Sequence, residues 1–187
     1  MQRIPKAIVA AQRAGARRYV ATDLMLLAQC RRSQQRVEEA RQLIHQSYEI
    51  CMQIGMGFLG TSVLAAMAAT SPDPAERRRL LAEGEALCTQ ECLAHARLMF
   101  HQEAMDISLL ERDWDEALRH ADVLDKFTAA EPLGTINLAT ARARALVALG
   151  RDGPSPECLA QVRRLRTRIL EAGLKPLLRG LDGVYEG

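Results

Sequence analysis

The sequence is poor in aromatic residues and in lysine. It holds three phenylalanines, three tyrosines and one tryptophan, and lysine stands only at positions 6, 126 and 175. Apolar residues nevertheless make up 48% of the 187 residues, and alanine and leucine dominate them. Both residues keep a helical backbone at little entropic cost, so the composition favours helices. No segment alternates with a period of two over the length of a strand, and we predict an all-α chain without β-sheet.

A Gly-Lys pair is also missing, which excludes a phosphate-binding loop of the form GxxxxGK[ST]. The three lysines follow Pro5, Asp125 and Leu174 instead. The formal net charge of +2 is too small to imply a polyanionic partner. Arginines cluster in several places, but glutamates interrupt them, and no recognition helix or aromatic platform accompanies them. We therefore predict no nucleic-acid partner.

Long hydrophobic runs are absent as well. No window approaches the roughly 20 apolar residues that a membrane helix needs. The early apolar run at 7–11 is too short for the core of a signal peptide. Five cysteines without the spacing of a secreted domain indicate reduced thiols. We expect a soluble, cytoplasmic protein with no membrane association.

What the chain does contain is a recurring signal for the start of a helix. At 73–76 an Asp caps, a Pro occupies the first helical position and a Glu the third. Ser155 and Pro156 repeat the cap and the proline, and similar starts stand near 36 and 113. An apolar helix precedes each start. The starts recur at intervals of roughly 40 residues, which is typical of arrays of helical hairpins.

These patterns predict a single helical repeat domain over 1–187. The first helices of the hairpins are expected at 18–32, 57–70, 93–111 and 134–149. We expect about four hairpins, at approximately 8–55, 57–91, 93–131 and 134–173, and a C-terminal capping segment at 174–187. Small residues late in the first helices should let neighbouring backbones approach closely; they are Ala28, Ala66, Ser108 and Ala145.

The pattern of a small residue, a turn and hydrophobic-Glu/Asp-Glu-Ala resembles a degenerate tetratricopeptide repeat. More specifically, the chain resembles the C-terminal helical region of bacterial multidomain adenylate/guanylate cyclases over about 13–181. The blocks that carry the resemblance are EGEAL at 83–87, CLAH at 92–95, RDWDEA at 112–117, AEPL at 130–133 and ARARALVALGR at 141–151. In those proteins a class III cyclase domain and an AAA/STAND-type ATPase precede the repeats. The resemblance implies a right-handed solenoid and a regulatory module in bacterial signalling, without either catalytic domain.

Four acidic residues surround the only tryptophan, Trp114, and they invite comparison with a catalytic carboxylate site. Asp113 and Glu116, however, have the spacing of a capping box at the start of an amphipathic helix. The carboxylates are consecutive on one turn, whereas an acid/base pair would converge from different elements. We interpret the cluster as a helix cap and expect Trp114 to be wedged between adjoining hairpins.

Cys88, Cys92 and His95 would share a face of an unbroken helix and could offer three zinc ligands. A nucleophile made of Cys92 with His95 or His101 is a second possibility. A turn near Glu91 should scatter these residues, and no third orienting group stands nearby. We predict no catalytic residue, no metal and no cofactor, and hence no enzyme.

The favoured function is protein–protein interaction, in which polar residues of the first helices line a groove. The candidates are Arg97, His101, Asn137, Arg142 and Arg144. Arg142 and Arg144 also lie in the ARARALVALGR block, and a guanidinium suits a carboxylate or phosphate partner. An ordinary exposed helix face would explain the same residues. The partner would be a protein or peptide, or upstream domains absent from this chain.

Two alternatives remain for the same fold. One is a structural oligomerisation domain, because the apolar residues Ile4, Ile8 and Val9 have no preceding hairpin to cover them. A homodimer is then expected, unless this segment wraps back onto the chain. The other alternative is a sensor module that binds a small ligand.

Overall fold

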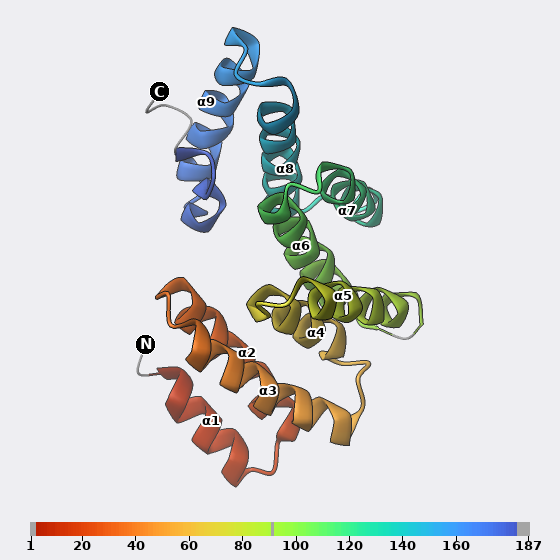
Figure 1. The fold of residues 1–187 in the computed structure, drawn as a ribbon. Coiled ribbons are helices and arrows are strands. Elements are labelled where there is room, and N and C mark those ends of the chain that lie inside the picture. The colour runs from red at the N-terminus through yellow and green to blue at the C-terminus, as the bar shows by residue number, and fades with distance from the viewer. Residues whose placement is uncertain (1–2, 91, 183–187) are drawn as a thin grey trace. The chain divides into compact units, whose positions relative to one another are not determined.

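The computed structural model describes residues 3–90 and 92–182, and within these ranges the chain forms nine α-helices, one short 3₁₀ helix and no strand (Figure 1). The predicted all-α class is thus confirmed. The elements are α1 (Arg3–Arg13), α2 (Arg17–Ser33), α3 (Val37–Ile54), α4 (Gly60–Thr70), α5 (Pro74–Thr89), α6 (Ala94–Glu111), α7 (Trp114–Phe127), α8 (Gly134–Asp152), α9 (Pro156–Glu171) and η1 (Lys175–Leu178).

The helices belong to two compact units, Met1–Glu103 and Ala104–Gly187, and the division falls within α6. In the first unit α2 packs against α3, α3 against α4, and α4 against α5. Small residues bring these helices close: Ala28 and Ala66 are buried, and the Ser47 hydroxyl donates to the Ala21 carbonyl at 3.0 Å. Larger apolar side chains complete this core, among them Met25, Ile44, Leu59 and Val63.

A glycine lies where α5 packs against α6. Gly84 faces the ring of Phe100, which is completely buried. A Cβ at position 84 would lie 3.0 Å from Phe100 Cδ2 and closer still to Cε2. The α5–α6 packing in the first unit therefore depends on the missing side chain.

In the second unit α7 packs against α8, and α8 against α9. Trp114, at the start of α7, covers Gly150 near the end of α8, where a Cβ would lie 2.7 Å from the indole Cη2. The half-buried indole thus packs between α7 and α8, the two helices that the prediction assigned to adjoining hairpins. The core of this unit also contains Leu138, Ala145, Val162, Leu165, Ile169 and Leu181.

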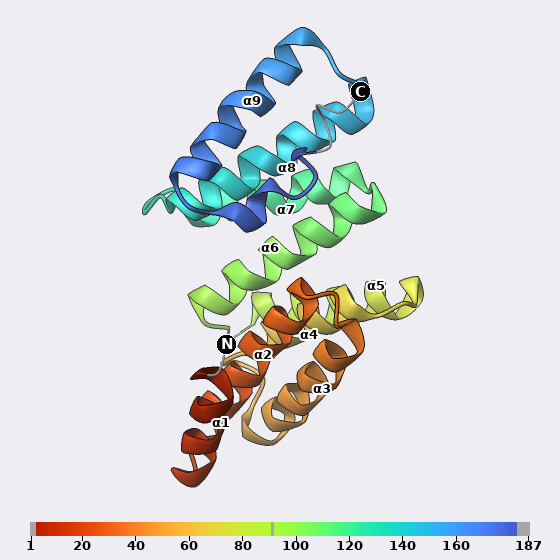
Figure 2. The same ribbon diagram turned by 90° about the vertical axis from the view of Figure 1, so that its left-hand side faces the viewer.

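The segment expected to cap the last hairpin is the 3₁₀ helix η1 and the residues after it. Figure 2 shows η1 lying against α8 and α9, and Leu181, just beyond it, is completely buried. The last part of the predicted capping segment, 183–187, lies outside the described residues.

The predicted helix caps are present. The carboxylate of Asp73 accepts from the Ala75 amide at 2.9 Å, that of Asp113 from the Glu116 amide at 3.2 Å, and the Ser155 hydroxyl from the Cys158 amide at 3.1 Å. The capping box is only half formed, because the Asp113 amide donates to the Ser108 carbonyl at 2.9 Å. These bonds satisfy amide groups that have no partner within their own helix.

The N-terminal segment forms a separate helix, α1, which the chain leaves through Gly15 at a φ of 65°. α1 packs against α2 but has no fully buried residue, and Ile4 and Ile8 are only half-buried. Among the described residues no helix combines the length and the apolar character needed to cross a membrane.

Candidate functional site

In the first unit, Arg97 and His101 of α6 are engaged in packing. The guanidinium of Arg97 donates to the Cys88 carbonyl at the end of α5. A cation at this position stabilises helix-end carbonyls that lack an amide partner. His101 is 4% exposed, and its ring stands edge-on to that of Phe100 with centroids 5.1 Å apart. His101 is therefore not on an exposed groove surface.

In the second unit, Arg142 of α8 is 5% exposed. Its Nη1 lies 2.6 Å from Oδ1 of Asp106 in α6, and its Nε donates to the Arg179 carbonyl at 3.0 Å. The guanidinium thus ties α8 both to α6 and to the chain that follows η1. Arg142 offers no exposed face to a ligand, unlike an ordinary surface arginine.

Asn137 and Arg144 share one side of α8 with Thr140, since the three residues are spaced at i, i+3 and i+7. This side faces α7. Arg144 makes ion pairs with Asp122 at 2.6 Å and with Asp125 at 2.8 Å. The Thr140 hydroxyl donates to the other oxygen of Asp125 at 2.8 Å. Both carboxylate oxygens of Asp125 are thereby fixed in position.

The pairs between α7 and α8 follow an antiparallel register. Asp115, near the start of α7, contacts Arg151 near the end of α8, and the Asp122–Arg144 pair lies two turns further along. Asp125 and Thr140 continue the series toward the loop that joins the helices. The series of contacts ends at Asn137, because the position opposite it lies beyond the end of α7, in the loop between α7 and α8.

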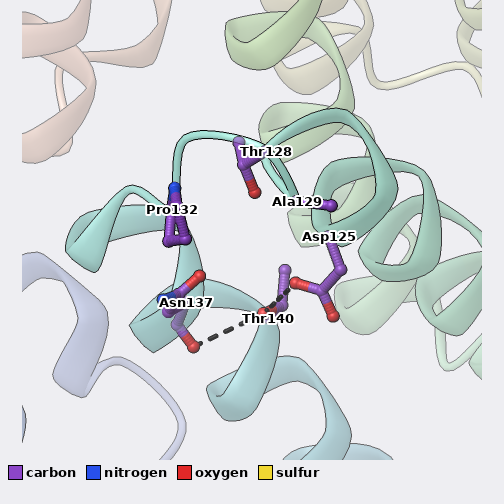
Figure 3. Close-up of a pocket in the computed structure, with 6 residues that line it drawn as sticks. All are labelled: Asp125, Thr128, Ala129, Pro132, Asn137 and Thr140. Carbon is purple, nitrogen blue, oxygen red and sulfur yellow. Dashed lines mark hydrogen bonds between the residues drawn. The ribbon is translucent and has the colours of Figure 1, made fainter.

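A cavity of about 360 Å³ opens where α7, this loop and α8 meet. We call it the α7–α8 corner; it is lined by Asp125, Thr128, Ala129, Pro132, Asn137 and Thr140. Figure 3 shows Asn137 beside Pro132, with Asp125 and Ala129 on the opposite side of the opening. The loop and two helices thus surround one concave surface.

The polar side chains of the corner differ in whether they already form hydrogen bonds within the protein. The Thr128 hydroxyl donates to the Leu124 carbonyl at 3.0 Å. The amide side chain of Asn137 is exposed, and no hydrogen bond from it to another described residue is found. A primary amide offers two donors and one acceptor. Asn137 is therefore the group best placed to bind a ligand.

The acidic cluster around Trp114 is dispersed among structural contacts. Asp113 caps α7, Asp115 pairs with Arg151, and Glu116 accepts from Nε of Arg119 at 3.1 and 2.9 Å through its two oxygens. Glu116 also lies 3.9 Å from Nε2 of the buried His120. These three carboxylates have different partners and do not converge on one position.

In the described part of the chain, the ligand atoms of Cys88, Cys92 and His95 do not lie close enough together for all three to hold one metal ion. The ring of His95 packs edge-on against Phe58, with centroids 5.7 Å apart. The Cys92 thiol points back to the Cys88 carbonyl, with Sγ 3.8 Å from the oxygen. The five cysteines are all free thiols.

No protein-family model matches the chain, and no match was found among curated proteins or solved structures.

Of the residues that form the α7–α8 corner, only Asn137 was predicted from the sequence. The spacing of Asp125 and Thr140 along their helices could have indicated that the two residues face each other. Asp122 and Asp125 at i, i+3 in one helix match Thr140 and Arg144 at i, i+4 in the next, as expected for facing sides of two helices.

Proposed function

We propose that the chain is a non-catalytic protein-interaction module built as a tetratricopeptide-like solenoid, and that it binds an extended peptide segment of a partner at the α7–α8 corner. The observation that carries this proposal is the exposed, unbonded amide of Asn137 at the rim of a cavity whose other polar groups are fixed. A preorganised polar rim lowers the entropic cost of binding.

The chemistry of the corner fits a peptide backbone. The Asn137 amide can donate to a carbonyl and accept from an N–H of the same segment, because it carries both functions. The oxygens of Asp125 retain lone pairs that can accept from a second N–H. Pro132 and Ala129 add apolar surface for a side chain.

A phosphate or carboxylate ligand fits the corner less well. The predicted role of the arginines was to offer a guanidinium to such a group. Arg144 instead neutralises Asp122 and Asp125, and Arg142 is buried against Asp106. The corner therefore presents an amide and a carboxylate to the ligand rather than a cation.

A regulatory role in a bacterial signalling protein of the cyclase–ATPase–repeat type belongs to the same proposal. It rests on the ordered sequence blocks, two of which supply the corner and its neighbours. AEPL at 130–133 contributes Pro132 to the cavity, and ARARALVALGR contributes Arg144, which fixes Asp125.

The proposal is tested by selecting peptides from a random-peptide phage library on the purified chain. The selected peptides are then measured by fluorescence polarisation against Asn137→Ala and against Thr135→Ala, which removes an exposed side chain from the same turn of α8. Loss of the amide should weaken binding about tenfold, since one or two hydrogen bonds at about 1 kcal/mol each are lost. The Thr135 variant should bind as wild type does.

Two outcomes would overturn the proposal. Selected peptides could bind the Asn137→Ala and wild-type proteins equally, which would place the site elsewhere. Selection could also enrich no sequence, which would leave the corner without a peptide ligand.

A second candidate, self-association, is favoured by α1. Its apolar residues Ile4 and Ile8 remain half-exposed after packing on α2, and Val9 is 45% exposed. Light scattering should then show dimers that dissociate on dilution and that Val9→Asp abolishes. A monomer over the whole concentration range would exclude this candidate.

A further inference from the structure

Two of the five cysteines lie together where α5 ends. Cys88, in the last turn of α5, is 3% exposed, and Cys92 is half-buried just ahead of α6. The Cys92 Sγ lies 3.8 Å from the Cys88 carbonyl oxygen, so the Cys92 side chain turns back toward the residue that carries the other thiol. The remaining cysteines, Cys30, Cys51 and Cys158, stand on three other helices.

The pair is reached through a second cavity, in the first unit. This cavity measures about 370 Å³, and its wall includes Cys92, Leu93, Phe58 and Arg18. Cys88 does not line it. The guanidinium of Arg18 is held over the Phe58 ring, 5.6 Å from the centroid. Of the two cysteines, Cys92 is therefore the one that a small reagent in this cavity can approach.

We propose that Cys88 and Cys92 are a redox modification site, at which a hydroperoxide oxidises Cys92 and Cys88 then closes a reversible disulfide. The proposal is independent of the peptide site at the α7–α8 corner.

The reaction balances with hydrogen peroxide as the oxidant. The Cys92 sulfur attacks one peroxide oxygen, the O–O bond breaks, and one water leaves with the thiol proton, which produces a sulfenic acid. The Cys88 sulfur attacks the sulfenic sulfur, the S–O bond breaks, and the hydroxyl group leaves as a second water with the Cys88 proton. The two thiols lose two electrons in total, and the peroxide takes up both.

The environment of each sulfur sets the order of the two steps. Burial and, after it, the neighbouring Cys92 raise the pKa of the Cys88 thiol to about 12, although Arg97 opposes the rise. The thiolate is the nucleophile in such reactions. Cys88 is therefore a poor first nucleophile at neutral pH, and the accessible Cys92 reacts before it. Closure of the disulfide should accelerate as the pH rises.

The chain offers a direct way to map the bond, because Glu91 separates the two cysteines in the sequence. The full chain is treated with hydrogen peroxide, its remaining thiols are blocked with N-ethylmaleimide in denaturant, and it is digested with a Glu-specific protease. Cleavage at Glu91 releases separate Cys88 and Cys92 peptides unless a disulfide joins them. Mass spectrometry should find the joined pair, and dithiothreitol should separate it.

Variants assign the steps. In Cys88→Ala, dimedone should trap a sulfenic acid on Cys92, because no resolving thiol remains. Cys158→Ala is the matched control and should form the joined peptides as wild type does. The proposal is overturned if peroxide leaves the wild-type peptides separate, if Cys92 oxidises to sulfinic acid without a link, or if dimedone labels Cys88 in Cys92→Ala as strongly as it labels Cys92 in Cys88→Ala.

Discussion

Replacing Asp106 by alanine should destabilise the second unit more than replacing Arg142 by methionine, although both changes break the same ion pair. The asymmetry follows from burial, since the Arg142 side chain is 6% exposed and that of Asp106 is 41% exposed. Asp106→Ala leaves a buried guanidinium whose remaining partners include the Arg179 carbonyl. Arg142→Met leaves a carboxylate that water already reaches.

The magnitudes can be worked from these contacts. Removing one partner of a buried ion pair costs about 3–5 kcal/mol when the other charge stays buried. Water can enter at the exposed Asp106 end, so we expect about 2–3 kcal/mol for Asp106→Ala. Arg142→Met loses the hydrogen bond to the Arg179 carbonyl, at about 1 kcal/mol, and fills most of the volume with an apolar side chain.

Urea unfolding followed by the fluorescence of Trp114 measures both variants, because the only tryptophan reports on the second unit. The free energy of unfolding is compared from the transition midpoints at a common slope. Arg166→Met is the control, since it breaks an exposed pair with Asp182 and should cost at most about 1 kcal/mol. The reasoning is refuted if Asp106→Ala stays within about 0.5 kcal/mol of wild type, or if Arg142→Met is the less stable of the two.

Three further predictions follow from the packing, the caps and the buried thiol. Gly84→Ala should lower the free energy of unfolding by about 1 kcal/mol in thermal unfolding, because the added Cβ overlaps the buried Phe100 ring. The cost of this overlap exceeds the gain of about 1 kcal/mol that alanine brings in helix propensity, and a stabilised variant would contradict the packing. Asp113→Ala should cost about 1 kcal/mol in urea by removing the cap on the Glu116 amide, and an unchanged midpoint would exclude that role. The folded-state pKa of Cys88 is raised from 9.0 to about 12, so the stability that the protonated thiol contributes is complete below pH 9 and is lost as the pH rises toward 12. Cys88→Ala should therefore flatten the fall of the urea midpoint with rising pH, and an equal fall in the wild type and the variant would contradict this prediction.

The helices and their caps could be predicted because their signals are local. Asp73 followed by Pro74, and Asp113 followed by Glu116, specify helix starts within a single turn, and the structure places α5 and α7 at these positions. The position of Trp114 was predictable for a related reason. A large apolar residue at the start of an amphipathic stripe must be covered by the next helix, and Gly150 provides the space.

The roles of the arginines could not be predicted, because they depend on partners far away in the sequence. Arg142 is buried by Asp106 and by the chain after η1, which are 36 and 37 residues away. Nothing in the local sequence distinguishes the buried Arg142 from the more exposed Arg144 on the same helix. The α7–α8 corner was missed for the same reason, since Asp125 and Thr140 meet only when the two helices pair in register.

The central claim is that the exposed Asn137 amide, rather than the arginines, binds the partner. The most direct test is a ¹H–¹⁵N correlation spectrum of the side-chain amide of Asn137 during titration with a phage-selected peptide, with the resonance pair assigned by its loss in Asn137→Ala. The account predicts that this pair shifts strongly while the backbone amides around the buried Arg142 move little. An unmoved Asn137 pair, with the largest shifts in the first unit, would contradict it.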